Sequence, residues 1–170
     1  ETTTVTGDHD YHDDVPCSGC GAFVPGYELE KNANGIYEID TADELYWFAA
    51  KVNGAYGMTA EPDADAVLTA DIVVNEHVLD SSGQLAESPE AYRLWTPIGY
   101  YHGNIKENIT QDVQYLLYQG QFDGNGHTIS GLYCEGEANE SVGLFGLIGE
   151  NAVIKNVHVK DTYFVPAADS

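Results

Sequence analysis

The chain has 170 residues, of which 43% are hydrophobic, and this composition excludes wholesale disorder. Its 28 acidic residues against 6 basic residues give a formal net charge of −22. Nucleic acids, anionic lipids and polyuronates are excluded as partners, because each would be repelled. No apolar run in the sequence is long enough to span a membrane.

The first part of the chain, residues 1–35, shows little hydrophobic periodicity. It is expected to be a linker or appendage that precedes an ordered domain over residues 36–170. Its opening, from Glu1 to Thr6, is polar and β-branched, as in a linker. We therefore expect the chain to be a segment of a larger protein.

Four candidate metal ligands lie close together in this appendage, in the pattern His-x2-His-x4-Cys-x2-Cys. The side chains of His9, His12, Cys17 and Cys20 are of the types and number that bind one Zn²⁺ ion tetrahedrally. A metal would also order a segment too short to have its own core. A disulfide between Cys17 and Cys20 and a pair of free thiols are the alternatives, and all three stay open.

The ordered domain is expected to begin with a short strand and one helix. Residues Ile36–Ile39 alternate in polarity as a strand does. Thr41 and Glu44 then have the spacing of a capping box, and Gly54 is a natural stop, so a helix is predicted over residues 42–53. Its apolar stripe consists of Leu45, Phe48, Ala49 and Val52.

Short strands and long polar excursions alternate in the rest of the chain. Residues 66–75 predict two strands with a corner near Asp71, and Trp95–Gly99 is a compact apolar segment between excursions at 80–93 and 100–114. Further strands are predicted over residues 115–118, 121–122, 128–133, 142–148, 153–159 and 162–165.

Glycine and Asn or Asp alternate with very short apolar runs in the segments Gly120–Leu132 and Gly143–Gly149. Each run is too brief for a helix, and the glycines mark sharp corners. The residues from Thr128 onward also superpose on those from Ile154 onward. This pattern is typical of a parallel β-helix, a solenoid. The amphipathic helix is a suitable lid for its open N-terminal end, since uncovered strand edges aggregate.

Five segments, in this order, resemble the GLUG-repeat surface proteins of gut Gram-positive bacteria, a motif that also appears in non-catalytic regions of bacterial immunoglobulin-cleaving metallopeptidases. The segments are Ile39–Ala50, Leu68–Ile72, Trp95–Gly99, Phe122–Leu132 and Gly143–Gly146. The resemblance implies a mainly β fold, a right-handed parallel β-helix with an N-terminal amphipathic capping helix. It also implies secretion, an extracellular location on the cell surface, and a role in adhesion or binding.

No enzymatic activity is expected. The turn Asp123–His127 offers an acid and a base, but Asp and Asn cap tight turns and glycine supplies positive φ, so a structural role is favoured. The resemblance supplies no catalytic residue, and no His-Glu-x-x-His motif occurs. A carbohydrate-active β-helix enzyme is the enzymatic alternative, although the few basic residues do not cluster as a lyase acting on acidic sugars requires.

Tyrosines gather in or beside the two excursions, whereas Trp47 and Trp95 are expected in the core. Loops that leave a packed framework carry binding surfaces, and exposed tyrosines stack on sugars or serve as protein contacts. The alternative is that these tyrosines cover the flank of the solenoid. The predicted ligand-binding residues are Tyr92, Tyr100, Tyr101, Tyr115 and Tyr118.

The predicted function is therefore a non-enzymatic surface module. It binds a host protein, such as an immunoglobulin or mucin, or a glycan, through loops 80–93 and 100–118, with no nucleic acid as a partner. A structural spacer is the second hypothesis. Apart from zinc in the appendage, no cofactor is expected.

Overall fold

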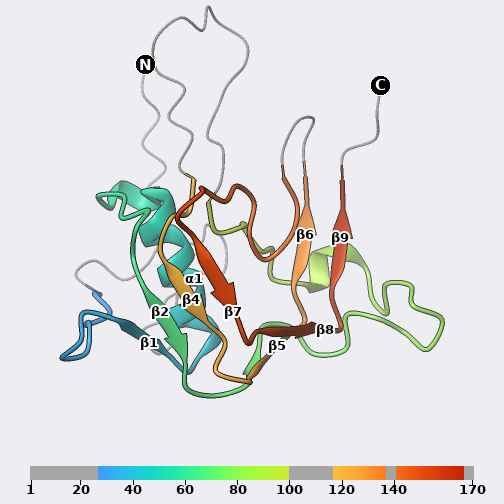
Figure 1. Cartoon of the computed structure of the whole chain (residues 1–170). Coiled ribbons are helices and arrows are strands. Elements are labelled where there is room, and N and C mark those ends of the chain that lie inside the picture. The colour runs from blue at the N-terminus through green and yellow to red at the C-terminus, as the bar shows by residue number, and fades with distance from the viewer. Residues whose placement is uncertain (1–26, 100–116, 137–140, 167–170) are drawn as a thin grey trace, which may run out of the picture.

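The computed structural model describes residues 27–99, 117–136 and 141–166 (Figure 1). The described part contains one α-helix, two short 3-10 helices and nine short strands. In chain order they are β1 (Tyr37–Ile39), α1 (Ala42–Asn53), η1 (Ala55–Gly57), β2 (Ala66–Leu68), β3 (Ile72–Val73), η2 (Pro89–Ala91), β4 (Gln121–Asp123), β5 (Thr128–Ser130), β6 (Tyr133–Glu135), β7 (Val153–Lys155), β8 (His158–Lys160) and β9 (Tyr163–Val165).

The strands form three small sheets, in the orders β1-β2-β4-β7, β3-β5-β8 and β6-β9, and every pairing is parallel. Because the pairs are in register, the inward side chain of one strand lies beside that of the next. Ile72, Ile129 and Val159 make one such row across β3, β5 and β8. Figure 1 shows β7, β8 and β9 beside β4, β5 and β6.

The predicted right-handed parallel β-helix with a capping helix is wrong for the described residues, which form these three separate sheets beside one helix. A fixed period is the signature by which a solenoid is recognised in a sequence. Here Ala66 pairs with both Tyr37 and Phe122, and Phe122 pairs with Ile154. The number of residues between one strand and the next in the sheet therefore nearly doubles and then falls again. Thr128 pairs with His158 rather than superposing on Ile154.

Helix α1 is confirmed with its predicted bounds. The Thr41 side chain accepts a hydrogen bond from the Glu44 amide, and the Glu44 carboxylate accepts one from the Thr41 amide. These bonds complete the capping box and satisfy two amides that the first turn leaves without partners. Gly54 ends the helix in the left-handed conformation, with φ of 64°.

The buried face of α1 and the inward side chains of the strands make one core. Trp47 and Trp95 are 0% and 1% exposed, which confirms their expected place there. The Phe48 ring lies 6.0 Å from the Phe122 ring, so the helix packs directly on β4. Tyr46, on the same helix, meets Trp95 edge to face at 5.1 Å.

The strands predicted over residues 36–39, 121–122 and 162–165 appear as β1, β4 and β9, whereas the longer ones predicted over 128–133 and 153–159 each include a corner and belong to two strands. Of the strand predicted over 115–118, residues 117 and 118 are described, and Tyr118 makes an isolated bridge there. The pair predicted over residues 66–75 appears as β2 and β3, with Asp71 at the corner. The strand predicted over residues 142–148 is wrong, because only isolated bridges at Phe145 and Ile148 form there. Two glycines in that segment, Gly143 and Gly146, break the run too often for a ladder.

Replacing Phe122 by alanine should lower the free energy of unfolding by about 3–5 kcal/mol, because the fully buried ring joins α1 to β4. The matched control is Val153→Ala on the neighbouring strand, which is 43% exposed and should change stability by less than about 0.5 kcal/mol. Urea denaturation measures both. Equal losses in the two variants would contradict the described core.

Candidate binding surface

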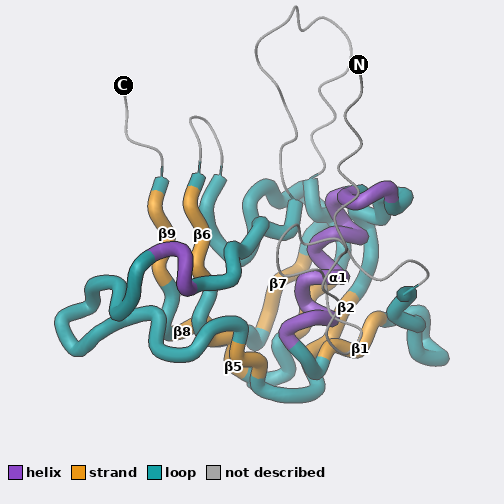
Figure 2. Tube along the Cα trace, turned by 180° about the vertical axis from the view of Figure 1, so that it is seen from behind, coloured by secondary structure: helices purple, strands orange, loops and turns teal. Residues whose placement is uncertain are grey.

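The most exposed described segment is the loop between β3 and Leu94, and we refer to residues 76–93 as the anchored loop. Nearly every residue from Ser81 to Ala91 is exposed. Figure 2 shows the loop projecting beyond the sheets, with η2 beside β6 and β9. A loop of this length whose one regular element is the short 3-10 helix η2 is typically functional or disordered. Hydrogen bonds at its base, in its first part and at its tip hold it in one shape.

The two ends of the loop are held together by Asn75. Its side-chain oxygen accepts a hydrogen bond from the Arg93 amide at 2.8 Å, and its side-chain nitrogen donates to the Arg93 carbonyl at 3.1 Å. The same nitrogen donates to the Gly131 carbonyl at 2.8 Å, which ties the base of the loop to the connection between β5 and β6. Gly131 is required there, because a Cβ would lie 1.8 Å from the Asn75 carbonyl oxygen.

Asp161, at the corner between β8 and β9, holds the first part of the loop. Its carboxylate accepts hydrogen bonds from the amides of Val78 at 3.2 Å and Leu79 at 2.8 Å. The Val78 side chain is fully buried, so the backbone and the side chain are both anchored. Hydrogen bonds to a charged acceptor are among the stronger ones in proteins.

The tip of the loop is organised by Asp80. One carboxylate oxygen accepts hydrogen bonds from the Ser82 hydroxyl, the Ser82 amide and the Gln84 amide, at 2.7, 2.8 and 3.0 Å. These bonds, led by that from the hydroxyl, hold the pKa of Asp80 below its usual value. An antiparallel bridge between Leu79 and Leu85 closes the turn.

Tyr92, a predicted ligand-binding residue, supports the loop from within. Its hydroxyl accepts a hydrogen bond from the Glu87 amide at 2.7 Å and donates to the Val78 carbonyl at 3.4 Å. Its ring lies 5.4 Å from the Tyr133 ring on β6. The half-buried side chain thus shapes the surface, and its contact with a ligand stays a prediction.

Arg93 connects the end of the loop to helix α1. One guanidinium nitrogen lies 2.6 Å from the Asp43 carboxylate, and the guanidinium carbon lies 3.8 Å from the centre of the Tyr46 ring. The other terminal nitrogen, Nη2, is buried and has no hydrogen-bond acceptor among the described residues. The Asp43 carboxylate therefore compensates the charge of the guanidinium, and the face of the Tyr46 ring adds a cation–π contact.

The exposed tip offers hydroxyl, amide and carboxylate groups to a partner. Hydroxyls and amides both donate and accept hydrogen bonds, whereas carboxylates only accept them. This chemistry suits a neutral polar or cationic partner and repels an anionic one. The exposed polar side chains are Ser81, Ser82, Gln84, Glu87, Ser88 and Glu90.

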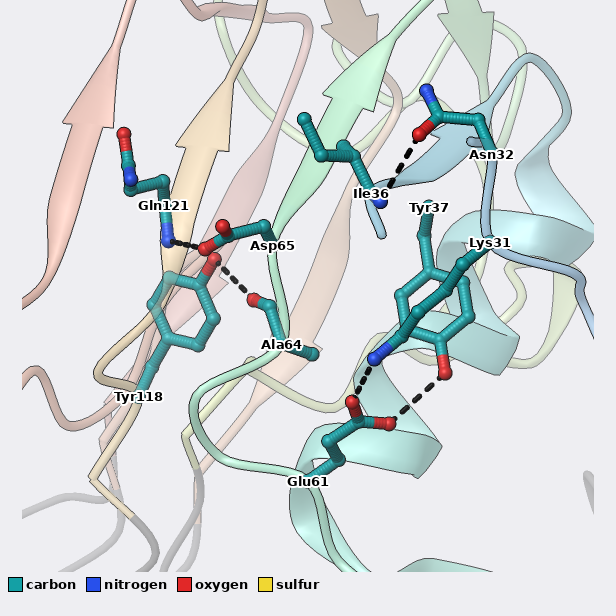
Figure 3. Close-up of polar contacts among 9 residues, drawn as sticks. All are labelled: Lys31, Asn32, Ile36, Tyr37, Glu61, Ala64, Asp65, Tyr118 and Gln121. Carbon is teal, nitrogen blue, oxygen red and sulfur yellow. Dashed lines mark hydrogen bonds and ion pairs between the residues drawn. The ribbon is translucent and has the colours of Figure 1, made fainter. Parts of the chain in front are cut away.

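Tyr118 does not belong to this surface, and its predicted exposure is wrong. The side chain is 0% exposed, and its hydroxyl donates to the Ala64 carbonyl at 3.0 Å (Figure 3). The ring packs edge to face on Phe48, with centres 6.2 Å apart. Burial raises the pKa of Tyr118. The residue is part of the core and is unable to stack on a ligand.

The other predicted site residues lie outside the described residues. They are the zinc candidates His9, His12, Cys17 and Cys20, and the tyrosines Tyr100, Tyr101 and Tyr115. Within the described ranges, no group of three or more His, Cys, Asp and Glu side chains is arranged to hold a metal ion.

The turn Asp123–His127 has the structural contacts of a corner. The Asp123 carboxylate accepts hydrogen bonds from the Asn125 amide at 2.9 Å and the Asn156 side chain at 3.0 Å. These contacts, that of Asn156 first, hold the pKa of Asp123 below its usual value. Gly124 lies against the next corner, where a Cβ would be 2.3 Å from the Cα of Val157.

Sequence reasoning missed Asp161 and Asn75, two of the side chains that anchor the loop. Asp161 has φ of 50°, and its acceptor role joins it to residues more than eighty positions earlier. Neither residue lies in a local pattern such as a capping box. An Asp or Asn beside a predicted corner is the one available signal, because these residues tolerate positive φ.

Removing the Asp161 carboxylate should release the anchored loop. Asp161→Gly keeps the freedom to adopt positive φ but removes both acceptors, at a loss of about 1–3 kcal/mol. Amide hydrogen exchange at Val78 and Leu79 should become faster. The matched variant Asp161→Asn keeps one acceptor oxygen, so its exchange rates should lie between those of the wild type and those of Asp161→Gly. Unchanged exchange in Asp161→Gly would contradict the anchoring role.

The corner carboxylates Asp71, Asp80 and Asp123 have pKa values lowered from 3.8, chiefly by hydrogen bonds from Thr128, Ser82 and Asn156. A lowered folded-state pKa stabilises the folded protein fully above 3.8, and this contribution is lost as pH falls below that value.

The triple Asp→Asn variant at these positions should therefore be less stable than the wild type at neutral pH. The difference in free energy of unfolding should shrink on acidification below pH 3.8. Urea denaturation at constant ionic strength measures the difference. A difference that grows on acidification would show that the carboxylates are not stabilised by these bonds.

No model of a known protein family matches the chain, and no solved structure matches it. Over 69 residues it is 35% identical to a protein of Evansella cellulosilytica named as a Gly-rich membrane protein, a match that covers 41% of this chain and 6% of that protein. Over 128 residues it is 29% identical to halomucin of Haloquadratum walsbyi, covering 74% of this chain and 1% of halomucin.

The chain thus spans a small fraction of the length of both relatives. The first of these relatives is named as a membrane protein, which agrees at a coarse level with the surface location expected for this chain. In the described part of the chain, no helix combines the length and apolar character that a membrane crossing needs. The resemblance to GLUG-repeat proteins stays a prediction.

Proposed function

We propose that this chain is a non-enzymatic binding module of a larger cell-surface protein, and that the anchored loop contacts its ligand. The ligand class is a host protein, such as an immunoglobulin or mucin, or a glycan. The supporting observation is that residues 76–93 are exposed at the tip yet fixed at three points, by Asn75, Asp161 and Tyr92.

The anchored loop is pre-organised, and this property favours a role in binding. A flexible loop loses conformational entropy when a ligand orders it, and this loss subtracts from the binding free energy. Here the internal hydrogen bonds of Asp80 and the bridge between Leu79 and Leu85 already fix the tip. A purely structural spacer does not require such an arrangement in an exposed excursion.

The charge of the protein narrows the ligand class. The net charge of −22 and the carboxylates of Glu87 and Glu90 at the tip repel anionic chains. Neutral sugars and neutral or basic protein surfaces are compatible with this negative charge. Zinc binding by His9, His12, Cys17 and Cys20 stays a separate proposal, since none of the four lies in the described residues.

A binding screen with a pair of charge-matched variants tests the proposal. The immobilised chain is screened against a glycan array, an immunoglobulin panel and purified mucin. The exposed tip residue Glu87 is reversed in Glu87→Lys, and the exposed Glu150, in the turn before β7, is reversed in Glu150→Lys as the control.

At least one saturable binder is expected, with its dissociation constant raised about tenfold, or about 1.4 kcal/mol, by Glu87→Lys alone. Equal effects of Glu87→Lys and Glu150→Lys on the dissociation constant would show that the anchored loop is not part of the binding site. A complete absence of binders would favour the spacer, and turnover of a neutral polysaccharide would contradict a non-enzymatic role.

A further inference from the structure

Exposed aliphatic side chains flank both ends of the anchored loop. Val73 is 53% exposed and Leu94 is 54% exposed, whereas their chain neighbours Ile72 and Trp95 are each 1% exposed. Because side chains alternate between the two faces of extended backbone, Val73 and Leu94 point away from the core. Each would be stabilised by an apolar partner that removes it from water.

The pairing of the strands places these two side chains close together. Val73 on β3 pairs in parallel with Ser130 on β5. Leu94 makes a parallel bridge with Tyr133 on β6, on the side of β6 away from β9. Ser130 and Tyr133 are three residues apart, and a chain advances at most about 3.6 Å per residue, so the backbones of Val73 and Leu94 lie within about 11 Å of each other. One partner surface is able to cover both.

The short helix η2 adds two small apolar side chains beside them. Pro89 and Ala91 are exposed, and η2 lies beside β6 and β9 (Figure 2). We refer to Val73, Pro89, Ala91 and Leu94 as the apolar flank. Exposed apolar side chains within a polar rim are typical of a site that contacts another protein.

The charged side chains around the apolar flank are mainly acidic. Glu76, Glu87 and Glu90 are exposed. Arg93 is the one Lys or Arg among residues 76–93, and its guanidinium is paired with Asp43 at 2.6 Å. The positive charge of Arg93 is thus compensated within the protein, whereas the carboxylates face solvent. This surface favours a partner that carries basic side chains around an apolar one.

The tyrosines beside the loop pack against one another. Tyr133 is 2% exposed, and its ring centre lies 5.4 Å from that of Tyr92 and 6.5 Å from that of Tyr163. The Tyr92 hydroxyl accepts a hydrogen bond from the Glu87 amide. A sugar ring stacks on an exposed aromatic face, but the apolar flank offers aliphatic groups. These groups favour a protein ligand over a glycan.

We propose that the ligand of the anchored loop is a protein. An apolar side chain of that protein packs on Val73 and Leu94, and its basic side chains face Glu87 and Glu90. This inference rests on the proposed function and narrows its ligand class from a protein or a glycan to a protein. A second copy of this chain is disfavoured, since it would bring two acidic loops together.

Removal of glycans from the binders separates the two ligand classes. Each protein of the immunoglobulin panel, and the purified mucin, is presented to the full chain with its glycans and after their enzymatic removal. The dissociation constant of the protein ligand should change by less than about twofold on removal of the glycans. Binding should weaken when the salt concentration rises from about 50 to about 500 mM, because opposite charges are screened.

Two results would overturn this inference in different ways. If binding is lost with the glycans while Glu87→Lys still weakens binding of the glycosylated form, the anchored loop is the site but its ligand is a glycan. If no protein and no glycan binds, the proposed function fails and this inference fails with it.

Matched variants locate the apolar contact. Leu94→Ser should weaken binding of the deglycosylated protein about tenfold. The control Ile148→Ser changes a side chain that is 51% exposed and lies on a segment bridged to Tyr118, and it should leave binding unchanged. Equal effects of Leu94→Ser and Ile148→Ser would overturn the proposal.

A second variant keeps the test valid if Leu94→Ser does not fold, which circular dichroism shows. Val73→Thr preserves the shape of the side chain and replaces one methyl group by a hydroxyl, so it should also weaken binding. Unchanged binding in Val73→Thr would then overturn the proposal. Self-association of the chain that Leu94→Ser abolishes would show a second copy on the apolar flank and would contradict it.

Discussion

The in-register parallel pairing of very short strands is the constraint on which the rest of this structure depends. It sets inward side chains directly against one another, so that Ala66, Phe122 and Ile154 form one continuous row through the core. It also forbids tight hairpins, because parallel strands begin at the same end and need a long return path. The long return segments, such as the anchored loop, are therefore a consequence of the pairing as well as the place where variation is tolerated.

Strands of two or three residues supply few ladder bonds, so the corners between them must contribute to the stability of the fold. Aspartates do this repeatedly: Asp65 accepts from the Gln121 amide at 2.7 Å, and Asp71 accepts from the Thr128 amide at 2.9 Å. Glycine is required where corners touch, as at Gly124 and Gly131. Corner positions are thus constrained in both polarity and volume, which leaves the exposed anchored loop as a surface able to meet a partner.

Local signals in the sequence were sufficient for α1, since the capping box of Thr41 and the stop at Gly54 are set by neighbouring residues. The same holds for the corner at Asp71 and for the buried Trp47 and Trp95. The fold class was wrong because a repeat inferred from similar residues at Thr128 and Ile154 assumes a constant spacing, whereas the return segments differ in length and set the register.

The candidate site was predicted only as a region. The excursion at 80–93 is the exposed part of the anchored loop, but Tyr118 looked like a surface residue because it lies between a polar excursion and Gly120. Its burial depends on Phe48 and Ala64, which are distant in the sequence. Asp161 was missed for the same reason, since no pattern near it signals a bond to Val78.

The excess of acidic residues now has a partly structural explanation. Carboxylates at corners accept backbone amides, a role that Lys and Arg are chemically unable to take. Net charge alone is therefore a poor guide to the partner, and the local charge of each surface is more informative. The tip of the anchored loop presents the carboxylates of Glu87 and Glu90, whereas Lys155 on β7 is paired with Asp123 at 3.3 Å. The selectivity of the anchored loop should therefore follow the charge of its own tip, where the two exposed carboxylates favour neutral or basic partner surfaces over anionic ones.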